Sequence, residues 1–164
     1  MSLIHPDFDR SLVVREADAE VVGRAPTTIR LLADSSATGG ALSTQRVTLT
    51  EGTNGANPHH HAHSAELFYV LDGTAQLLSG DDVVTAGRGD LVVVPPNVPH
   101  AFAAAPGESA DILIVITPGV ERFAYFRHLE SIAYGRVSPE SLLDVQELYD
   151  TYFRQSEAWN AARA

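Results

Sequence analysis

This chain contains the stretch Pro58-His59-His60-His61-Ala62-His63-Ser64-Ala65-Glu66-Leu67-Phe68-Tyr69-Val70-Leu71-Asp72-Gly73, in which four imidazoles and one carboxylate lead into an apolar strand. Residues two apart in an extended chain point to the same face, so His59 and His61 share one side and His60 faces the other. A carboxylate such as Glu66 at the start of a buried strand is costly without a partner, and a divalent cation is a suitable one. The stretch therefore predicts a metal site on a β scaffold.

The strand that follows Glu66 alternates between two faces. Glu66, Phe68 and Val70 share one face, and the residues between them share the other. Ala62 to Ala65 are small enough to form a turn between the histidines and this strand.

A further ligand is expected later in the chain. Gly87 to Asp90 has the composition of a turn, Leu91 to Val94 of a buried strand, and Pro95 to Asn97 of a second turn. Val98 to Phe102 then begins another strand, and it contains His100. His100 is thus the candidate fourth ligand.

Together these segments resemble a known family. The patterns His59-x-His61-x4-Glu66-x6-Gly73 and Gly89-x5-Pro95-x-Asn97-x2-His100 are similar to the two signature motifs of the cupin superfamily. The resemblance implies an all-β fold, a double-stranded β-helix or jelly-roll barrel. It also implies that one metal ion is bound by His59, His61, Glu66 and His100.

The match departs from the family pattern at two positions. Asn97 stands where glycine is usual, but asparagine tolerates a positive φ and so keeps the turn. Ala104 stands where asparagine is frequent, and this position touches no ligand.

Two alternative interpretations stay open for the histidines. The tract could be a solvated loop that binds metal adventitiously, although Glu66, Gly73 and His100 argue against this. A register with His61 and His63 as ligands leaves too few residues before Glu66. We expect His60 and His63 at the rim or behind the ligands, and His5 and His128 at packing or surface positions.

Composition bounds the class of protein. The chain has 164 residues, 45% of them hydrophobic, which is enough for one domain with its own core. Its formal net charge of -10 disfavours nucleic acid and anionic membranes as partners. There is no cysteine, no long apolar run and no signal-peptide pattern, so a cytoplasmic protein without disulfides or thiolate ligands is expected.

The other predicted strands are short and regularly spaced, as in a sandwich or small barrel. They are 12–14, 27–33, 42–50, 75–78, 82–85, 100–104 and 111–117. Met1 to Arg10 is expected to form an arm, Glu51 to Asn57 a loop, and Ser79-Gly80-Asp81 a hairpin turn. Ile112 to Ile116 is apolar on both faces, so its outer face should be covered.

The last third of the chain changes to a helical period. A helix is predicted over 120–134 with Gly135 as its C-terminal cap, and a second helix from Ser138-Pro139-Glu140 to about Tyr152. We therefore divide the chain into a barrel with its N-terminal arm, residues 1–118, and a helical segment, residues 119–164. The helical segment is expected to pack on the barrel or on a partner in a homodimer.

A weaker resemblance bears on function. Residues 30–34 and 38–43 and the Thr117-Pro118-Gly119 junction are similar to compact bacterial cupins described as quercetin-dioxygenase-like. This implies an O2-dependent dioxygenase acting on a small enolisable or polyphenolic substrate. The apolar inner face of the strands, with Phe68, Val70, Val93 and Phe102, would suit a hydrophobic ring.

The ligand set leaves the metal and the reaction class open. Nitrogen and oxygen ligands suit iron, manganese, nickel, cobalt, copper or zinc. Glu66 is a candidate catalytic base as well as a ligand. The alternative function is a non-redox cupin: an isomerase, a lyase or a small-molecule binding protein.

Overall fold

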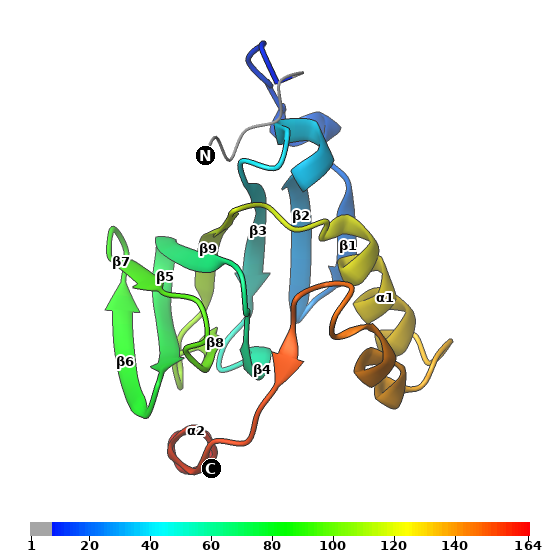
Figure 1. The fold of residues 1–164 in the computed structure, drawn as a ribbon. Coiled ribbons are helices and arrows are strands. Elements are labelled where there is room, and N and C mark those ends of the chain that lie inside the picture. Colours follow the sequence, from blue (N-terminus) through cyan, green and yellow to red (C-terminus); the bar gives the residue numbers. More distant parts are fainter. Residues whose placement is uncertain (1–7) are drawn as a thin grey trace.

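A computed structural model describes residues 8–164 as a strongly curved antiparallel sheet with short helices around it (Figure 1). The strands are β1 (Val21–Arg24), β2 (Thr27–Ala33), β3 (Ser43–Leu49), β4 (Asn54–His60), β5 (Ala65–Ser79), β6 (Asp82–Gly87), β7 (Leu91–Val94), β8 (His100–Ala104), β9 (Ala110–Thr117) and β10 (Tyr152–Phe153). The helical elements are the 3-10 turns η1 (Glu16–Asp18), η2 (Ser35–Thr38) and η3 (Pro139–Val145) and the helices α1 (Phe123–Ala133) and α2 (Glu157–Ala162). The predicted all-β class, a cupin-type barrel followed by two C-terminal helices, is confirmed.

The strands pair in the order β1-β2-β3-β9-β5-β8-β4-β10, and β6 and β7 pair with β5 as well. The long strand β5 therefore belongs to both halves of the barrel. Its first half pairs with β7 and β9, and its second half pairs with β6 and β8. The two halves enclose one apolar core, formed by alternate side chains such as Val47, Leu49, Phe68 and Val70. The inward face of β5, with Phe68 and Val70, is the one that the sequence predicts.

The bend of β5 lies next to Gly73. The ladder to β9 shifts register between Val70 and Asp72, and Gly73 then has a φ of 72°. A β-carbon at this position would lie 2.0 Å from the carbonyl oxygen of Ser109. Glycine is therefore required both by the left-handed backbone and by the close approach of the neighbouring chain.

A substitution at this bend tests that account. Gly73→Ala is expected to lower the free energy of unfolding by more than about 2 kcal/mol, because the strained backbone and the contact with Ser109 add to each other. The matched control is Gly80→Ala, whose φ is 64° but whose β-carbon would meet nothing within 4 Å. Urea unfolding should give a loss of about 1 kcal/mol for the control. Equal losses in the two variants would contradict a steric role for Ser109.

The C-terminal helices cover two separate parts of the barrel. Tyr125 and Phe126 of α1 pack against Val22 of β1 and Leu31 of β2. Trp159 of α2 is buried against Leu78 of β5 and against Ala101 and Ala103 of β8. Gly135, with a φ of 70°, follows α1 as the sequence predicts. Residues 119–164 thus pack on the barrel of their own chain.

The prediction of a second helix from Ser138 to about Tyr152 is wrong in its length. Ser138 caps its start as predicted and accepts a hydrogen bond from the backbone N–H of Glu140. The chain forms only the 3-10 turn η3, however, and Asp150 then adopts a φ of 48°. Pairing of Tyr152 and Phe153 with strand β4 replaces the helix, and α2 lies beyond it. A tertiary pairing has overridden the local helical period.

Several strand predictions also need correction. Residues Leu12 to Val14 form no strand and are exposed, whereas the unpredicted β1 forms a hairpin with β2. The second half of the predicted loop 51–57 belongs to β4. Gly55, which suggests a turn, is instead needed in that strand because a β-carbon there would lie 2.3 Å from the ring of Phe102. The predicted arm falls mostly on residues 1–7, outside the described residues.

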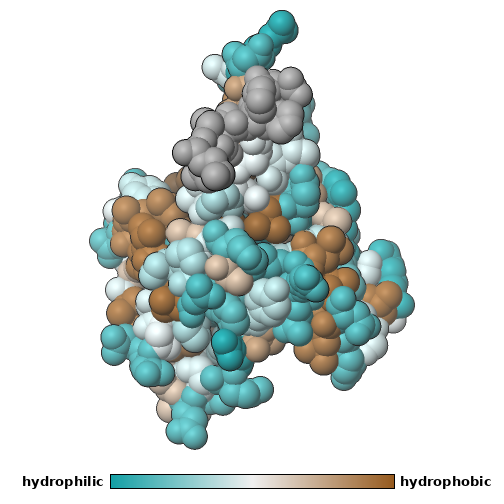
Figure 2. Space-filling view, in the orientation of Figure 1, coloured by the Kyte–Doolittle hydropathy of each residue, from teal (hydrophilic) through white to brown (hydrophobic). Residues whose placement is uncertain are grey.

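The outer face of β7, β5 and β9 remains partly apolar and uncovered. Val93 is predicted to face the interior, but it points outward because its neighbour Val94 takes the inner position next to Glu66. Strand β7 is therefore only half-buried, with Leu91 and Val93 exposed beside Tyr69. Figure 2 shows hydrophobic surface over β7 and β5. Within residues 8–164 no helix has the length and hydropathy of a membrane span.

Candidate metal centre

The predicted ligands come together because of strand pairing. His59 on β4 and His100 on β8 are direct cross-strand partners. His61 follows just after the end of β4, on the same side as His59. Glu66 is the second residue of β5 and lies on the inner face of the strand, which it shares with Phe68. All four side chains are buried, with at most 5% of any residue exposed.

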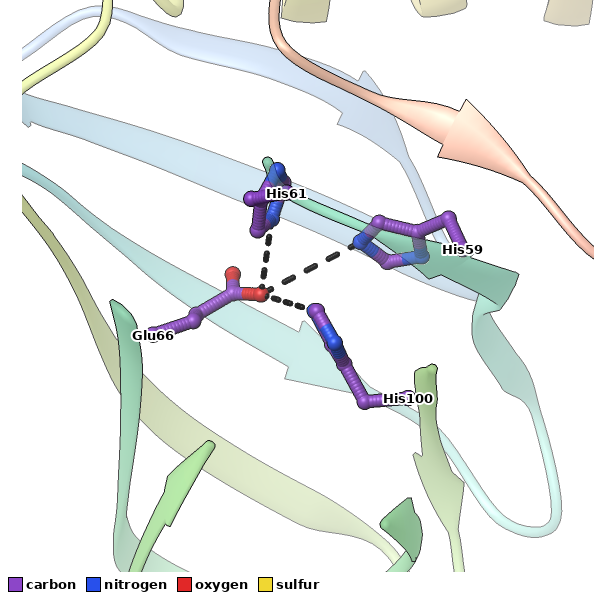
Figure 3. Close-up of side chains that lie close together, drawn as sticks. All are labelled: His59, His61, Glu66 and His100. Carbon is purple, nitrogen blue, oxygen red and sulfur yellow. Dashed lines mark hydrogen bonds and ion pairs between the residues drawn. The ribbon is translucent and has the colours of Figure 1, made fainter. Parts of the chain in front are cut away.

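The four side chains converge on one point, as Figure 3 shows. Their ligand atoms all lie within 4.8 Å of one another. The Oε2 of Glu66 is 2.5 Å from Nε2 of His100, 3.1 Å from that of His61 and 3.9 Å from that of His59. The structure thus brings together every residue that the motif resemblance assigns to the metal.

The second nitrogen of each ring fixes its orientation. Nδ1 of His59 donates to the carbonyl of Asn57 at 2.7 Å, and Nδ1 of His100 donates to that of Val98 at 2.9 Å. Nδ1 of His61 donates to the carbonyl of Asp150 at 2.5 Å. A carbonyl can only accept, so each Nδ1 carries a proton, and each ring presents a lone pair at Nε2 when it is neutral.

This arrangement calls for a cation. Three lone pairs facing a carboxylate oxygen repel one another unless a proton or a metal ion lies between them. Metal–nitrogen and metal–oxygen bonds of about 2.1 Å put adjacent ligand atoms about 3 Å apart and opposite ones about 4 Å apart. The observed separations fit this spacing after small movements. Three imidazoles and one carboxylate therefore suit a single divalent transition metal.

The pKa shifts in the metal-free cluster also favour binding of a cation. Burial lowers the pKa of His59 well below its ordinary value, and the neighbouring His100 and His61 add to this. Burial would also lower the pKa of His100, but its hydrogen bond to Glu66 prevails and raises it. Burial would raise the pKa of Glu66, yet the charge of His61 and the hydrogen bonds hold it well below its usual range. Glu66 is therefore anionic and ready to ligate a cation.

Asp150 supports the site and was missed by the sequence analysis. Besides the bond from its carbonyl to His61, its carboxylate accepts the backbone N–H groups of Ala62 at 2.8 Å and His63 at 3.0 Å. It thereby fixes both the His61 ring and the loop that carries it. No pattern around Tyr149-Asp150-Thr151 marks this role, because the contact spans 89 residues.

The turn between the two motifs is also tied to the ligand loop. Asn97 has a φ of 67°, which confirms the predicted positive φ, and its N–H donates to the carbonyl of His61 at 2.7 Å. The two cupin-like motifs are thus held together by backbone as well as by side chains.

The other histidines lie outside the cluster. His60 faces away, stacks on Tyr152 and accepts a hydrogen bond from Arg154. The side chain of His63 is 82% exposed and lies 3.4 Å from the carboxylate of Asp150. His128 is hydrogen-bonded to Ser141, and His5 lies outside the described residues. The register with His61 and His63 as a ligand pair therefore does not match the observed geometry.

A cavity of about 140 Å³ adjoins the cluster and contacts His59 and Glu66. Its walls are formed by β2, β3, β4, β8, α1 and the C-terminal segment, and they are mainly apolar. Phe102, predicted to face a substrate, lines this cavity. Several polar side chains line it as well, among them Gln45 and Arg122. The cluster is thus buried from bulk water but borders on space for a small molecule.

The comparisons with known proteins agree with this fold. Residues 45–116 match the family model of the cupin domain. The matched residues run from β3 to β9 and so lie within the barrel. A comparison with curated proteins finds no match.

Similar solved structures share the barrel at low sequence identity. An RmlC-like cupin from Shewanella frigidimarina is 16% identical, over 70% of this chain and 96% of that one, with a TM-score of 0.58. The polyketide cyclase RemF from Streptomyces resistomycificus is 24% identical, over 66% and 80%, with a TM-score of 0.54. Streptomyces Pac13 with uridine is 17% identical, over 69% and 86%, with a TM-score of 0.56. At these identities the likeness concerns the fold.

Proposed function

We propose that this protein is a mononuclear metal-dependent enzyme that oxidises a small enolisable substrate with O2. The observation that supports this most is the convergence of His59, His61, Glu66 and His100 beside an apolar cavity. Four protein ligands on an octahedral ion leave two positions for exogenous molecules. The quercetin-dioxygenase-like resemblance in the sequence gives the reaction class.

The residues of the chain have separate parts in such a reaction. A divalent ion bound here would act as a Lewis acid toward the oxygens of an enol or a hydroxyketone. The carboxylate of Glu66 lies at the cavity wall, where it can take a proton from the substrate. The apolar walls exclude water from the reacting carbon. The three Nδ1–H bonds to backbone carbonyls keep the imidazoles in place throughout.

The cavity limits the size of the substrate. An apolar cavity of about 150 Å³ holds a molecule such as benzene, and the present cavity is about 140 Å³. A flavonol with three rings exceeds this volume. We therefore favour a substrate with one ring or a short chain over a polyphenol of the quercetin type.

Metal content and oxygen uptake test this function together. Untagged protein purified without a chelator is expected to hold about one equivalent of iron, manganese, nickel, cobalt or copper per chain. A panel of small diketones and single-ring enols should then give metal-dependent O2 consumption. Glu66→Gln should retain the fold and lower kcat or metal content by at least about tenfold. A full metal complement with normal turnover in that variant would refute the role of Glu66.

A non-redox reaction is the second candidate, because Glu66 can move a proton at the cavity wall without O2. Solved structures with this fold include the polyketide cyclase RemF and Pac13, described as a nucleoside dehydratase. Zinc as the sole metal, with no O2 uptake, would favour this isomerase or lyase class.

We also propose that two copies associate through the outer face of β7, β5 and β9. Leu91 and Val93 are more than half exposed there, beside Tyr69, and contiguous apolar surface of this kind usually marks an interface. Sedimentation is expected to show a homodimer, and Val93→Asp should shift it to a monomer. A monomeric native protein would remove this proposal.

A further inference from the structure

Two side chains that line the cavity beside the metal centre carry polar atoms without a hydrogen-bond partner in the described residues. In residues 8–164 three buried side-chain atoms lack a hydrogen-bond partner: Ser43 Oγ, Gln45 Oε1 and Arg122 Nε. Two of these side chains, Gln45 and Arg122, line the cavity that contacts His59 and Glu66. Buried groups without partners are rare in proteins, and each requires an explanation.

Arg122 is held rigidly at the start of α1. Its Nη1 donates to the Thr151 hydroxyl at 2.7 Å and to the Tyr149 carbonyl at 3.1 Å. Its guanidinium carbon lies 4.2 Å from the centre of the Tyr125 ring. These contacts position the guanidinium and leave Nε without an acceptor.

This guanidinium has no anionic partner in the described part of the chain. The residue is only 4% exposed, and no carboxylate there forms an ion pair with its side chain. Asp34 accepts the backbone N–H of Arg122 at 2.6 Å, not the guanidinium. An unpaired buried charge is strongly unfavourable, so a complementary anion is expected from outside the chain.

A bound metal ion makes an anionic ligand at this site more favourable still. A divalent cation carries two positive charges, Glu66 removes one and Arg122 adds one, so the loaded site has a net charge of about +2 in a buried setting. A neutral enol leaves this charge uncompensated, whereas a carboxylate lowers it. The excess is local, because the whole chain has a formal charge of -10.

We propose that Arg122 and Gln45 form a carboxylate-binding subsite, so that the substrate is a small organic acid. The guanidinium of Arg122 donates to the carboxylate, and the side-chain amide of Gln45 forms a hydrogen bond with the same molecule. The adjacent carbonyl or enol oxygen then faces the metal ligands. Given a cavity of about 140 Å³, a 2-oxo acid or hydroxy acid of roughly six to eight non-hydrogen atoms fits. This inference rests on the proposed function, because it names the substrate class of the same site.

The test compares an acid with its neutral isostere. Pyruvate and pyruvamide have the same size and the same vicinal oxygens, and they differ in the charge of one end. Calorimetry on zinc-loaded protein is expected to show pyruvate binding at least about thirtyfold more tightly than pyruvamide. In Arg122→Gln the preference should fall by at least about tenfold, with the zinc content unchanged, and the remaining preference comes from the metal. Equal binding of the two probes by the native protein would overturn the proposal.

Two further variants keep this test decisive. Gln45→Glu keeps the hydrogen bonds of Arg122 to Tyr149 and Thr151 and adds a carboxylate to the cavity wall, so it should also lower the preference for pyruvate, even if Arg122→Gln does not fold. Arg127→Gln is the matched control, because Arg127 is exposed and paired with Glu20, and it should leave the preference unchanged. An unchanged preference in folded Arg122→Gln or Gln45→Glu would assign the anion to another group.

The same preparations separate this inference from the proposed function. The preference for pyruvate should persist in metal-free protein, although it will be smaller. Protein that shows the preference but consumes no O2 would refute the oxygenase and keep the subsite. Protein that consumes O2 with neutral enols and binds both probes equally would refute the subsite and keep the oxygenase.

Discussion

Replacing His100 by alanine is expected to abolish stoichiometric metal binding, with an affinity loss greater than about a hundredfold. His100 presents Nε2 from strand β8 directly opposite His59, and it makes the closest contact with Glu66, at 2.5 Å. Even residues that only support metal ligands cost 10 to 100-fold in affinity when lost, so a ligand should cost more. Metal analysis after dialysis measures the effect.

His60→Ala is the matched control for this substitution. His60 belongs to the same histidine tract, but its ring faces Tyr152 and Arg154 on the other side of β4. The control should retain its metal, with at most a modest loss of stability from the lost stacking. If His60→Ala removed the metal and His100→Ala kept a full equivalent, the assignment of ligands would be refuted.

The second large effect is expected at Asp150, which contacts no metal. Asp150→Asn keeps the carbonyl that accepts from His61 and also tolerates the φ of 48°, because asparagine adopts the left-handed region readily. It removes the charged carboxylate that accepts the N–H groups of Ala62 and His63. The loop that carries His61 should then loosen, and metal affinity should fall about 10 to 100-fold.

Metal titration monitored by competition with a chelator gives this number. The exposed Asp144 supplies the control, because Asp144→Asn makes the same change of charge away from the loop. An unchanged affinity in Asp150→Asn, with the fold intact, would show that the backbone alone holds His61 in place.

The sequence by itself determined the fold class and the composition of the site. Alternation of apolar residues fixes which face of β3 and β5 is buried, and this is a local property of extended chain. The spacing of His59, His61 and Glu66, and of Gly89 and His100, identified the four side chains that converge. Gly80, Asn97 and Gly135 were predicted to lie in turns or at a helix end, and each of them has a positive φ.

The tertiary structure decided everything that depends on distant pairing. The segment after Ser138 has a helical period, but Tyr152 and Phe153 lie extended because they pair with the strand that carries His59 and His60. Gly55 suggests a turn in isolation and proves to be a strand residue beneath Phe102. Val93 faces outward because pairing with β5 sets its register.

The metal ligands can be predicted from the sequence, whereas the residues that support and surround them cannot, because only the latter depend on contacts between distant segments. Ligands lie in compact motifs because neighbouring strand positions bring them together, so spacing along the chain is informative. Asp150 reaches His61 across 89 residues, and Arg122 and Gln45 meet at one cavity from different elements. Such contacts arise only when the strands pair and the helices dock, and their residue types carry no mark of it in the sequence.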